Sequence, residues 1–460
     1  MANSEKTMSA LSQYIELFDS HRDTIESKSA QVMNDCRVVA RRTLDGKHLP
    51  KKGTEGYEKT SIDEMFSLDY GVNINRVNIP VDVSLSFKCD VPNMSTIMAF
   101  VVNDSFVASS TLHNKMPQGV IIDSLAKVAK EQPQLVSQYY NQLADNENVG
   151  VALNTMLAQD GVFIYVPRGV VMERPIQLVN IFNSAASLMG VRRLLIVVEE
   201  GAKAQLLICD HTQNNEYRYL SSQVLEAFVA QNASLDIYDI EESSETTSRY
   251  SQLFARQESH STLLINGVTL TSGTTRNDYN IDLVGENCSS TLAGMAIGSG
   301  RQHIDNNSSI RHLSTRGNSN QLFKYVLDEE STGAFEGAIY VAEGAQYTEA
   351  YQSNRNLLAS KQARMHTKPQ LEIYNDDVKC SHGATTGQLD ADALFYMRSR
   401  GIPEQEARMM LMQAFMVDVI DMVKMDGLRD RLRHLVEKRF YGQQAKCADC
   451  GATCHDVKQD

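Results

Sequence analysis

Apolar residues near the start of the chain recur with the spacing of a helix. Leu11, Ile15 and Phe18 begin the series, and residues 8–45 contain neither Gly nor Pro. Such spacing predicts an amphipathic helical segment. The polar residues 47–59, which include Gly and several Lys, predict a loop.

Two further patterns complete the N-terminal region. From Ile79 onward, the segment VDVSLSF alternates apolar and polar residues, which predicts a strand. Helical spacing returns over residues 124–143 and is interrupted at Pro133. We therefore expect residues 1–150 to form a mostly helical domain with some strand.

Beyond Gly161 the pattern changes to short apolar runs divided by Gly, Asn and polar pairs. Strand follows strand with hardly a helical window, which excludes a doubly wound α/β fold because that fold needs a helix between strands. A sandwich, barrel, propeller or solenoid remains. The word V-x-E-G-A occurs at Val198–Ala202 and again at Val341–Ala345. A turn repeated at strand ends suits stacked solenoid coils, but its irregular spacing does not decide between these folds.

The C-terminal region predicts three helices. Asp390 or Asp392 can cap the first helix, and Gly401 can end it. Pro403 suits the first position of the second helix, and the third follows Gly427.

Methionines cluster in the second of these helices, at Met409, Met410, Met412 and Met416. A methionine-rich helix surface can serve as an adaptable docking site. The alternative, which we prefer from the residues alone, is that these methionines pack against a neighbouring helix.

Composition describes an ordinary globular chain of 460 residues, 42% apolar and 22% charged, long enough for two or three domains. The net charge of −13 argues against nucleic acid as the main partner, because phosphate binding needs a basic face. No run approaches the roughly 20 apolar residues of a membrane span. The first residues also lack the pattern of a secretory signal. We therefore expect a cytoplasmic protein that binds neither nucleic acid nor membrane.

The eight cysteines fall into two groups. Five are scattered singly, which suits a reducing compartment. Cys447, Cys450 and Cys454 stand together with His455 near the end of the chain. These ligand types can hold zinc or an iron–sulfur cluster, and free thiols on a flexible tail are the alternative.

Cys380 and His382 stand two residues apart in a Cys-Ser-His-Gly segment that predicts a turn after a polar strand end. On an extended segment both side chains leave the same face. A thiolate and an imidazole there form a half-site for a soft metal or an iron–sulfur cluster. The alternative is a small buried Cys beside a hydrogen-bonded turn His.

Two other polar groups can be weighed in the same way. His303 and Asp305 share a strand face, with His312 nearby, so a metal site is conceivable. We prefer a polar ladder on a solvated solenoid face. Asp376 and Asp377 are adjacent and would point to opposite faces of a strand, which argues against a shared acid–base role.

One long stretch of sequence carries a family resemblance. The words EIYNDDVKCSHGATTGQLDADALFYMRSRGI and FEGAIYVAEGAQYTEAYQSNRNLLASKQARMHTKPQ, followed by helices ending in LRDRLRHLVEKRF, resemble the SufD branch of the SufB/SufD family. That family belongs to the SUF iron–sulfur assembly system. The resemblance covers about residues 150–440 in pattern and is nearly word for word over 335–440. SufB members carry a Glu-His-Glu word where this chain has Cys380–Gly383, which favours the SufD branch.

The resemblance implies a mainly β fold. A right-handed parallel β-helix (a β-solenoid) is expected over residues 151–375, after the N-terminal domain at 1–150. A C-terminal helical domain is expected at 376–442 and a flexible Cys-rich tail at 443–460.

The resemblance also implies a function. The chain would be a non-catalytic scaffold that pairs with a SufB-like subunit through the β-helix. It would dock a SufC-like ATP-binding-cassette ATPase through its C-terminal helices, where Met409, Met412 and Met416 are candidates. It has no G-x-x-x-x-G-K-[ST] loop of its own to hydrolyse ATP. An isolated chain could also pair with itself through the surface that SufB would use.

His382 matches the family position implicated in cluster assembly at the SufB–SufD interface. Cys380 is then a second ligand or a packing residue, and the nascent iron–sulfur cluster is held transiently with the partner. The resemblance leaves open whether a flavin binds the complex and whether the tail holds a metal.

Two other classes of function stay open on the sequence. Solenoid folds also carry secreted polysaccharide-active enzymes, but neither a carboxylate-lined groove nor a secretory signal is evident. A metal carrier acting through the Cys-rich tail is the second.

Overall fold

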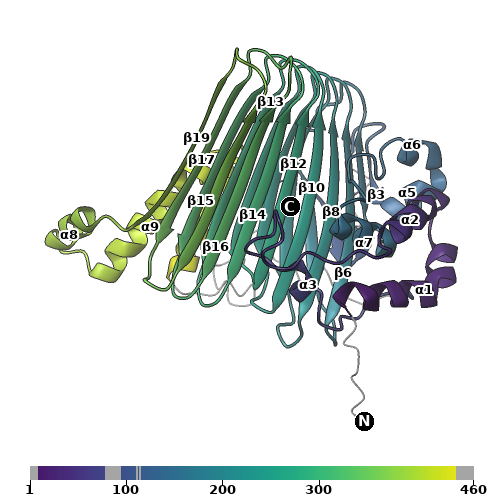
Figure 1. Ribbon diagram of the computed structural model, residues 1–460, viewed down its shortest axis with the longest axis horizontal. Helices are drawn as coiled ribbons and strands as arrows, with labels where there is room; N and C mark the ends of the chain where they lie inside the picture. The colour runs from purple at the N-terminus through teal and green to yellow at the C-terminus, as the bar shows by residue number, and fades with distance from the viewer. Residues whose placement is uncertain (1–8, 78–94, 110–111, 113–115, 442–460) are drawn as a thin grey trace, which may run out of the picture. The chain divides into compact units, whose positions relative to one another are not determined.

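The computed structural model describes residues 9–77, 95–109, 112 and 116–441 (Figure 1). Of these, the residues up to Gln388 form one compact unit, and those from Leu389 onward form another. The strand predicted from Ile79 and the cysteines of the tail lie outside the described residues.

The first unit is built around a parallel β-solenoid of about 8 turns. From β4 onward, successive strands alternate between two sheets, and each strand from β4 to β17 pairs in parallel with the one two further along the chain (Figure 1). Among the described strands, the antiparallel pairs are those at the first end, where β2 pairs with β1 and β3 with β4. The mainly β fold with a parallel solenoid is therefore confirmed.

One sheet has ten strands, in the order β19-β17-β15-β13-β11-β9-β7-β5-β1-β2. Their bounds are β1 Ile97–Val102, β2 Ser105–Ala108, β5 Ile176–Phe182, β7 Lys203–Thr212, β9 Ser234–Glu242, β11 Thr262–Thr271, β13 Ser289–Gly298, β15 Asn318–Leu327, β17 Glu349–Leu358 and β19 Lys379–Gln388.

The other sheet has nine strands, in the order β18-β16-β14-β12-β10-β8-β6-β4-β3. Their bounds are β3 Ile121–Ser124, β4 Val162–Val166, β6 Leu188–Val198, β8 Tyr219–Val229, β10 Thr247–Gln257, β12 Thr274–Leu283, β14 His303–His312, β16 Thr332–Val341 and β18 Arg364–Ile373.

Alternate residues of each strand point between the two sheets and form the core. Leu263 and Ile265 of β11, for example, are buried in one cluster with Leu292 of the next strand in the same sheet. Because the side-chain period of a strand is two, the intervening residues point outward. The alternation seen in the sequence is thus the packing pattern of the coils.

Helices of the N-terminal region cover the first coils. Their bounds are α1 Ala10–Lys28, α2 Gln31–Thr43, α3 Ile62–Met65, α5 Leu125–Glu131, α6 Pro133–Ser137 and α7 Val149–Leu157. The helical pattern over 8–45 is split at Ser29, whose extended backbone ends α1. Pro133 begins α6, so the predicted interruption at this residue is confirmed.

The buried ion pair of Arg193 and Glu226 joins these helices to the solenoid. The two side chains lie 2.9 Å apart and are almost completely buried. Glu226 also accepts hydrogen bonds from the backbone N–H groups of Asn141, Leu143 and Ala144. Arg193 also donates to Thr155 at 3.0 Å and to Asn141 at 2.8 Å. These hydrogen bonds offset part of the cost of burying the two charges.

The described part of the second unit contains three helices, α8 Ala391–Ser399, α9 Glu404–Ile420 and α10 Asp426–Phe440. Asp390 caps α8 by accepting hydrogen bonds from the N–H groups of Asp392 and Ala393. Gly401 follows the helix with a φ of 88°, which costs a residue without a side chain little. The predicted start and end of α8 are confirmed.

None of the helices within the described ranges is long and apolar enough to cross a membrane.

Candidate functional site

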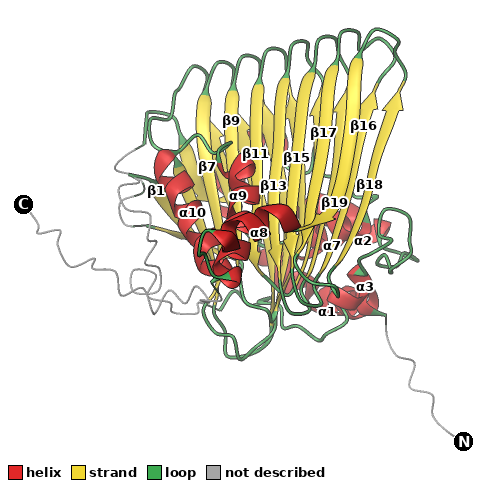
Figure 2. Ribbon diagram, turned by 90° about the vertical axis from the view of Figure 1, so that its left-hand side faces the viewer, coloured by secondary structure: helices red, strands yellow, loops and turns green. Residues whose placement is uncertain are grey.

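The last coil of the solenoid leaves an open end. β18 and β19 are the terminal strands of their sheets, so each pairs with a described strand on one side only (Figure 2). All ten residues of β19 except Cys380 are exposed. An open strand edge is a template for pairing with another chain.

His382 lies on this open end. It occupies β19 beside Gln352 of β17, which is itself beside Gln321 of β15. Gln321 and Gln352 are buried, whereas His382, on the last coil, is exposed. The imidazole therefore belongs to the inward-facing ladder of side chains but remains accessible at its end.

Cys380 lies on the same face of β19 as His382, as the spacing predicts. It packs against the cluster of Ile339, Val341 and Ala350. Burial raises the pKa of its thiol, although a backbone hydrogen bond from Ala350 acts in the other direction. In the isolated chain Cys380 is therefore a half-buried thiol, and His382 is the accessible ligand type.

The turn predicted for the Cys-Ser-His-Gly segment is wrong, because residues 379–388 form strand β19. Its small and polar residues indicated a turn when taken alone. Pairing along the whole length of β17 holds them extended.

The edge of β18 has one missing donor. The N–H groups of Arg364 and Tyr374 donate to β16 and its extension, at 3.1 Å to Ser331 and 2.9 Å to Val341. Backbone N–H groups point alternately to the two sides of a strand. Because those of Arg364 and Tyr374 point to β16, the N–H groups of the odd-numbered residues of β18 point to the open edge. Pro369 occupies one of these odd positions, where its missing N–H leaves the existing ladder intact.

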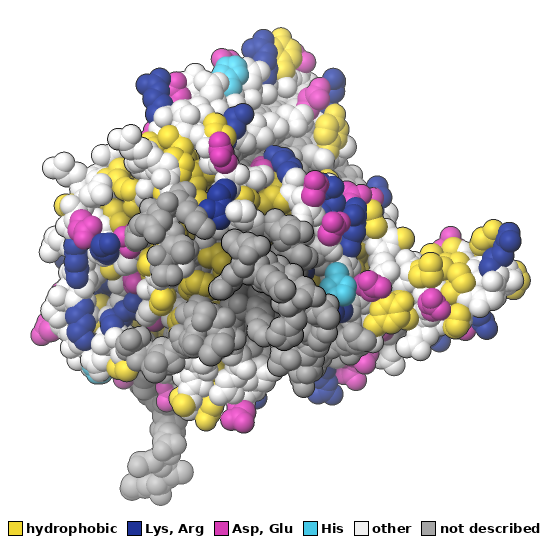
Figure 3. Space-filling model, turned by 180° about the vertical axis from the view of Figure 1, so that it is seen from behind, with side chains coloured by type: hydrophobic (Ala, Val, Ile, Leu, Met, Phe, Trp, Pro, Cys, Tyr) yellow, Lys and Arg dark blue, Asp and Glu magenta, His cyan; other side chains and the backbone are white. Residues whose placement is uncertain are grey.

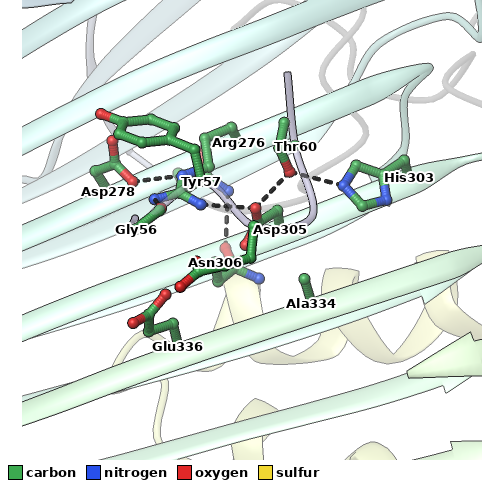
Figure 4. Close-up of polar contacts among 12 residues, drawn as sticks. Gly56, Tyr57, Thr60, Arg276, Asp278, His303, Asp305, Asn306, Ala334 and Glu336 are labelled. Carbon is green, nitrogen blue, oxygen red and sulfur yellow. Dashed lines mark hydrogen bonds and ion pairs between the residues drawn. The ribbon is translucent and has the colours of Figure 1, made fainter. Parts of the chain in front are cut away.

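A second polar cluster lies on the outer face of the nine-stranded sheet (Figure 4). The Thr60 hydroxyl donates to Asp305 and contacts Nε2 of His303 at 2.8 Å. Arg276 binds Asp305 at 2.7 Å and Asp278 at 2.6 Å, and donates to the Gly56 carbonyl. We call residues 49–67, which carry Gly56 and Thr60, the clasp.

The clasp changes the interpretation of His303 and Asp305. They share a strand face as predicted, but the clasp covers that face, so it is not a solvated ladder. His312 points into the solenoid, where it is buried and bonds to Ser319 at 2.8 Å. Burial lowers the pKa of His303, which suits a neutral hydrogen-bonding role. The hypothesis of a metal site formed by His303, Asp305 and His312 is therefore wrong.

Among the described residues, no group of three or more His, Cys, Asp or Glu side chains is arranged to hold a metal ion. A cluster assembled at His382 would therefore need ligands from outside the described residues. Asp376 and Asp377 are both exposed in the turn before β19. The tail cysteines at 447, 450 and 454 lie outside the described residues.

The methionines of α9 are placed differently from one another. Met409, Met412 and Met416 are buried, whereas Met410 is 43% exposed. Among the residues described from Leu389 onward, the most exposed aromatic side chains are instead on α8, where Phe395 and Tyr396 are 74% and 58% exposed. Neither residue was predicted from the sequence, although four consecutive apolar residues, 394–397, in a short capped helix were a signal, because they cannot all face one neighbour.

Charge is mixed over the surface. On the visible part of the face in Figure 3, Lys and Arg side chains are interspersed with Asp and Glu. The net charge of −13 is thus not gathered into one patch on that part of the molecule.

Comparison with known families agrees with this architecture. Residues 181–415 match the SufBD core domain of SUF-system FeS cluster assembly, and residues 8–178 match the SufBD protein N-terminal region. The chain belongs to the SufB/SufD family of iron–sulfur cluster assembly proteins.

Three individual relatives are similar to this chain over most of its length. An iron–sulfur cluster assembly SufBD family protein of Synechocystis is 29% identical over 89% of this chain and 91% of its own length. The assembly protein SufD of Escherichia coli is 30% identical over 63% of this chain and 69% of its own. The chloroplastic protein ABCI7 of Arabidopsis thaliana is 30% identical over 73% of this chain and 72% of its own.

Proposed function

We propose that this chain is a non-catalytic, cytoplasmic scaffold subunit on which a nascent iron–sulfur cluster is assembled. The observation that carries the proposal is the exposed imidazole of His382 at the open end of the solenoid. A neutral imidazole is a competent iron ligand, and a single imidazole cannot hold a cluster alone. Ligands from a second subunit would complete the coordination sphere.

The second subunit is a SufB-like chain that pairs with the open edges of β18 and β19. Both edges expose a row of backbone donors and acceptors, and strand addition there would continue both sheets. Pairing would bring the partner's side chains beside His382. Cys380 is close enough in sequence to join them, but its packing favours a structural role.

The C-terminal helices dock a SufC-like ATPase in this proposal. The exposed Phe395 and Tyr396 of α8, with Met410 of α9, are the apolar side chains available for contact. The docking residues proposed from the sequence are Met409, Met412 and Met416. Because they are buried, they would contribute indirectly, through the packing that positions α9. Exposed aromatic residues are typical anchors of protein interfaces.

The test is co-purification with SufB-like and SufC-like partners, followed by anaerobic reconstitution and counts of iron and sulfide. His382→Ala should leave the complex intact and abolish most cluster formation, because it removes one ligand without touching a buried contact. Ser381→Ala, on the opposite face of β19, is the matched control. Normal cluster content in the His382→Ala complex would contradict the proposal.

The Cys-rich tail is a separate proposal. Three thiols and an imidazole within residues 447–455 can chelate zinc or iron. A chain ended after Tyr441 should then lose a bound metal ion while still supporting cluster assembly with its partners. Equal metal content in the full-length and shortened chains, measured by elemental analysis, would contradict it.

A further inference from the structure

A ladder of polar side chains inside the solenoid ends at His382. Gln321, Gln352 and His382 occupy matching positions of β15, β17 and β19, which are three consecutive strands of one sheet. Neighbouring strands lie about 4.8 Å apart, so the side chains at matching positions of parallel strands stack on one another. Stacked amide side chains of this kind can hydrogen-bond from one strand to the next.

The amide group of Gln352 is fixed on two sides. Its Nε2 donates to Oε1 of Gln321 at 3.4 Å, and the same oxygen of Gln321 accepts from the Ser308 hydroxyl at 2.7 Å. A Cβ atom on Gly337 would lie only 2.1 Å from Nε2 of Gln352. The missing side chain of Gly337 therefore provides the room in which this amide lies.

One atom of the fixed amide has no partner. Oε1 of Gln352 is buried and accepts no hydrogen bond from the described residues. A buried acceptor without a donor destabilises a fold, and such atoms are rare in native proteins. Because Nε2 of Gln352 is turned toward β15, Oε1 of the same planar group is turned toward β19.

His382 is the donor type that lies one step further along the ladder. Its ring is exposed and makes no hydrogen bond within the described part of the chain, so it is free to turn about its side-chain bonds. The step from β17 to β19 is the one that Gln352 already bridges toward β15. A neutral imidazole carries one N–H donor and one acceptor nitrogen.

We propose that Gln352 is a positioning residue for His382. Its Oε1 accepts a hydrogen bond from one ring nitrogen of His382, and this bond directs the other ring nitrogen out of the open end. The two nitrogens point in nearly opposite directions from the ring, so a donor turned into the solenoid leaves the acceptor turned outward. The inference rests on the proposed function, because it assigns what orients the ligand offered to the nascent cluster.

This contact would give His382 two properties that a metal ligand needs. It would select the tautomer in which the outward nitrogen is unprotonated and available, and it would hold the plane of the ring. Metal-ligating histidines almost always donate their second ring N–H to a carboxylate, a carbonyl or water. Gln352 offers such an oxygen from a strand that is paired on both sides.

The tautomer of His382 tests the proposal in the full-length chain without any metal. Long-range ¹H–¹⁵N NMR of the ¹⁵N-histidine-labelled chain, at a pH where imidazole is neutral, reports which ring nitrogen carries the proton. His382→Ala assigns the signal. We expect one tautomer in the native chain and both in Gln352→Met, which nearly keeps the volume and removes the acceptor. Gln352→Glu keeps an acceptor oxygen and should retain the single tautomer.

Gln223→Met is the matched control. It removes another buried amide from β8, several coils from β19, and should leave the tautomer of His382 unchanged. Thermal unfolding shows whether each variant is folded. In the complex with its partners, Gln352→Met should lower the content of iron and sulfide about tenfold, and Gln352→Glu should restore most of it.

The outcomes separate this inference from the proposed function. A mixture of tautomers in the native chain overturns the inference even if Gln352→Met does not fold, and so does a single tautomer that persists in Gln352→Met. If the tautomer responds but the His382→Ala complex still assembles a normal cluster, the contact stands and the proposed function fails. If the tautomer does not respond while His382→Ala blocks assembly, the proposed function stands without the contact.

Discussion

At the scale of residues, the interior of the solenoid contains charged side chains that the alternation of apolar and polar residues did not predict. Arg249 of β10 faces inward, bonded to Asp239 and 3.4 Å from Asp210. Glu241 lies near them, fully buried and hydrogen-bonded to the Thr275 hydroxyl at 2.8 Å. Alternation assigns polar residues to the outside of a coil, so an inward ionic cluster is visible only when both sheets are in place.

Glu241 makes the stability of the fold depend on pH. Burial raises the pKa of its carboxyl to about 7, although Arg249 and the Thr275 hydroxyl act in the other direction. Its pKa in the unfolded chain is about 4.3. The native state therefore holds a proton that the unfolded state has lost, and its stability falls as pH rises from the lower value to the higher.

Glu241→Gln removes this dependence. The variant and the native chain should have similar free energies of unfolding near pH 4, and the variant should be more stable by up to about 3 kcal/mol above pH 7. Urea denaturation at a series of pH values measures the difference. The exposed Glu245→Gln is the control, and a difference that stays constant with pH would contradict the assignment.

The Arg193–Glu226 pair gives a second prediction at this scale. Arg193→Met leaves the Glu226 carboxylate buried without its cation, which should cost about 3–5 kcal/mol of stability. Adding Glu226→Gln removes the buried charge and should restore part of the loss. Denaturation measures the loss of stability in each single variant and in the double variant. A loss in the double variant equal to the sum of the two single losses would indicate that the residues do not act as a pair.

At the scale of elements, local signals in the sequence located several boundaries. Asp390, Gly401 and Pro133 each mark an end of a helix because capping and the missing N–H of proline act locally. The break at Ser29 between α1 and α2 had no such marker. The contacts of the clasp could not be predicted from local sequence either, because Thr60 and Asp305 are 245 positions apart in the chain.

A buried residue of α9 and an exposed residue of α8 allow the contribution to stability to be tested separately from the proposed docking of the ATPase. Met416 is completely buried, so Met416→Ala should lower the stability of the C-terminal helices by about 2–5 kcal/mol. Phe395→Ser, at a side chain that is 74% exposed, should change stability by less than about 0.5 kcal/mol and weaken binding of a SufC-like ATPase. Thermal unfolding and a binding titration measure the two effects. Undiminished ATPase binding by Phe395→Ser would remove α8 from the docking surface.

At the scale of the whole molecule, the strand pattern excluded α/β folds and left four β architectures open. Coil spacing was too irregular to choose among them, and the family resemblance pointed to the solenoid. What the sequence could not show is that the solenoid stays open at its last coil. That openness depends on which described strand has no further described neighbour in each sheet, and this is known only when all the coils are in place.

In the proposed function, the same openness explains why one chain would be insufficient for cluster assembly. His382 ends an inward ladder whose earlier members, Gln321 and Gln352, are buried by the coils that follow them. A partner stacked on the open end would enclose His382 in the same way and could supply thiolates beside it. In this account the solenoid positions a ligand, and the partner completes the site.

The most direct test is whether the imidazole of His382 is bound to the assembled cluster. This chain alone would be labelled with ¹⁵N-histidine, assembled with unlabelled SufB-like and SufC-like partners, loaded anaerobically and reduced for pulsed EPR. The account predicts a ¹⁵N hyperfine coupling to the cluster that disappears in His382→Ala. A cluster of normal yield without that coupling would contradict it.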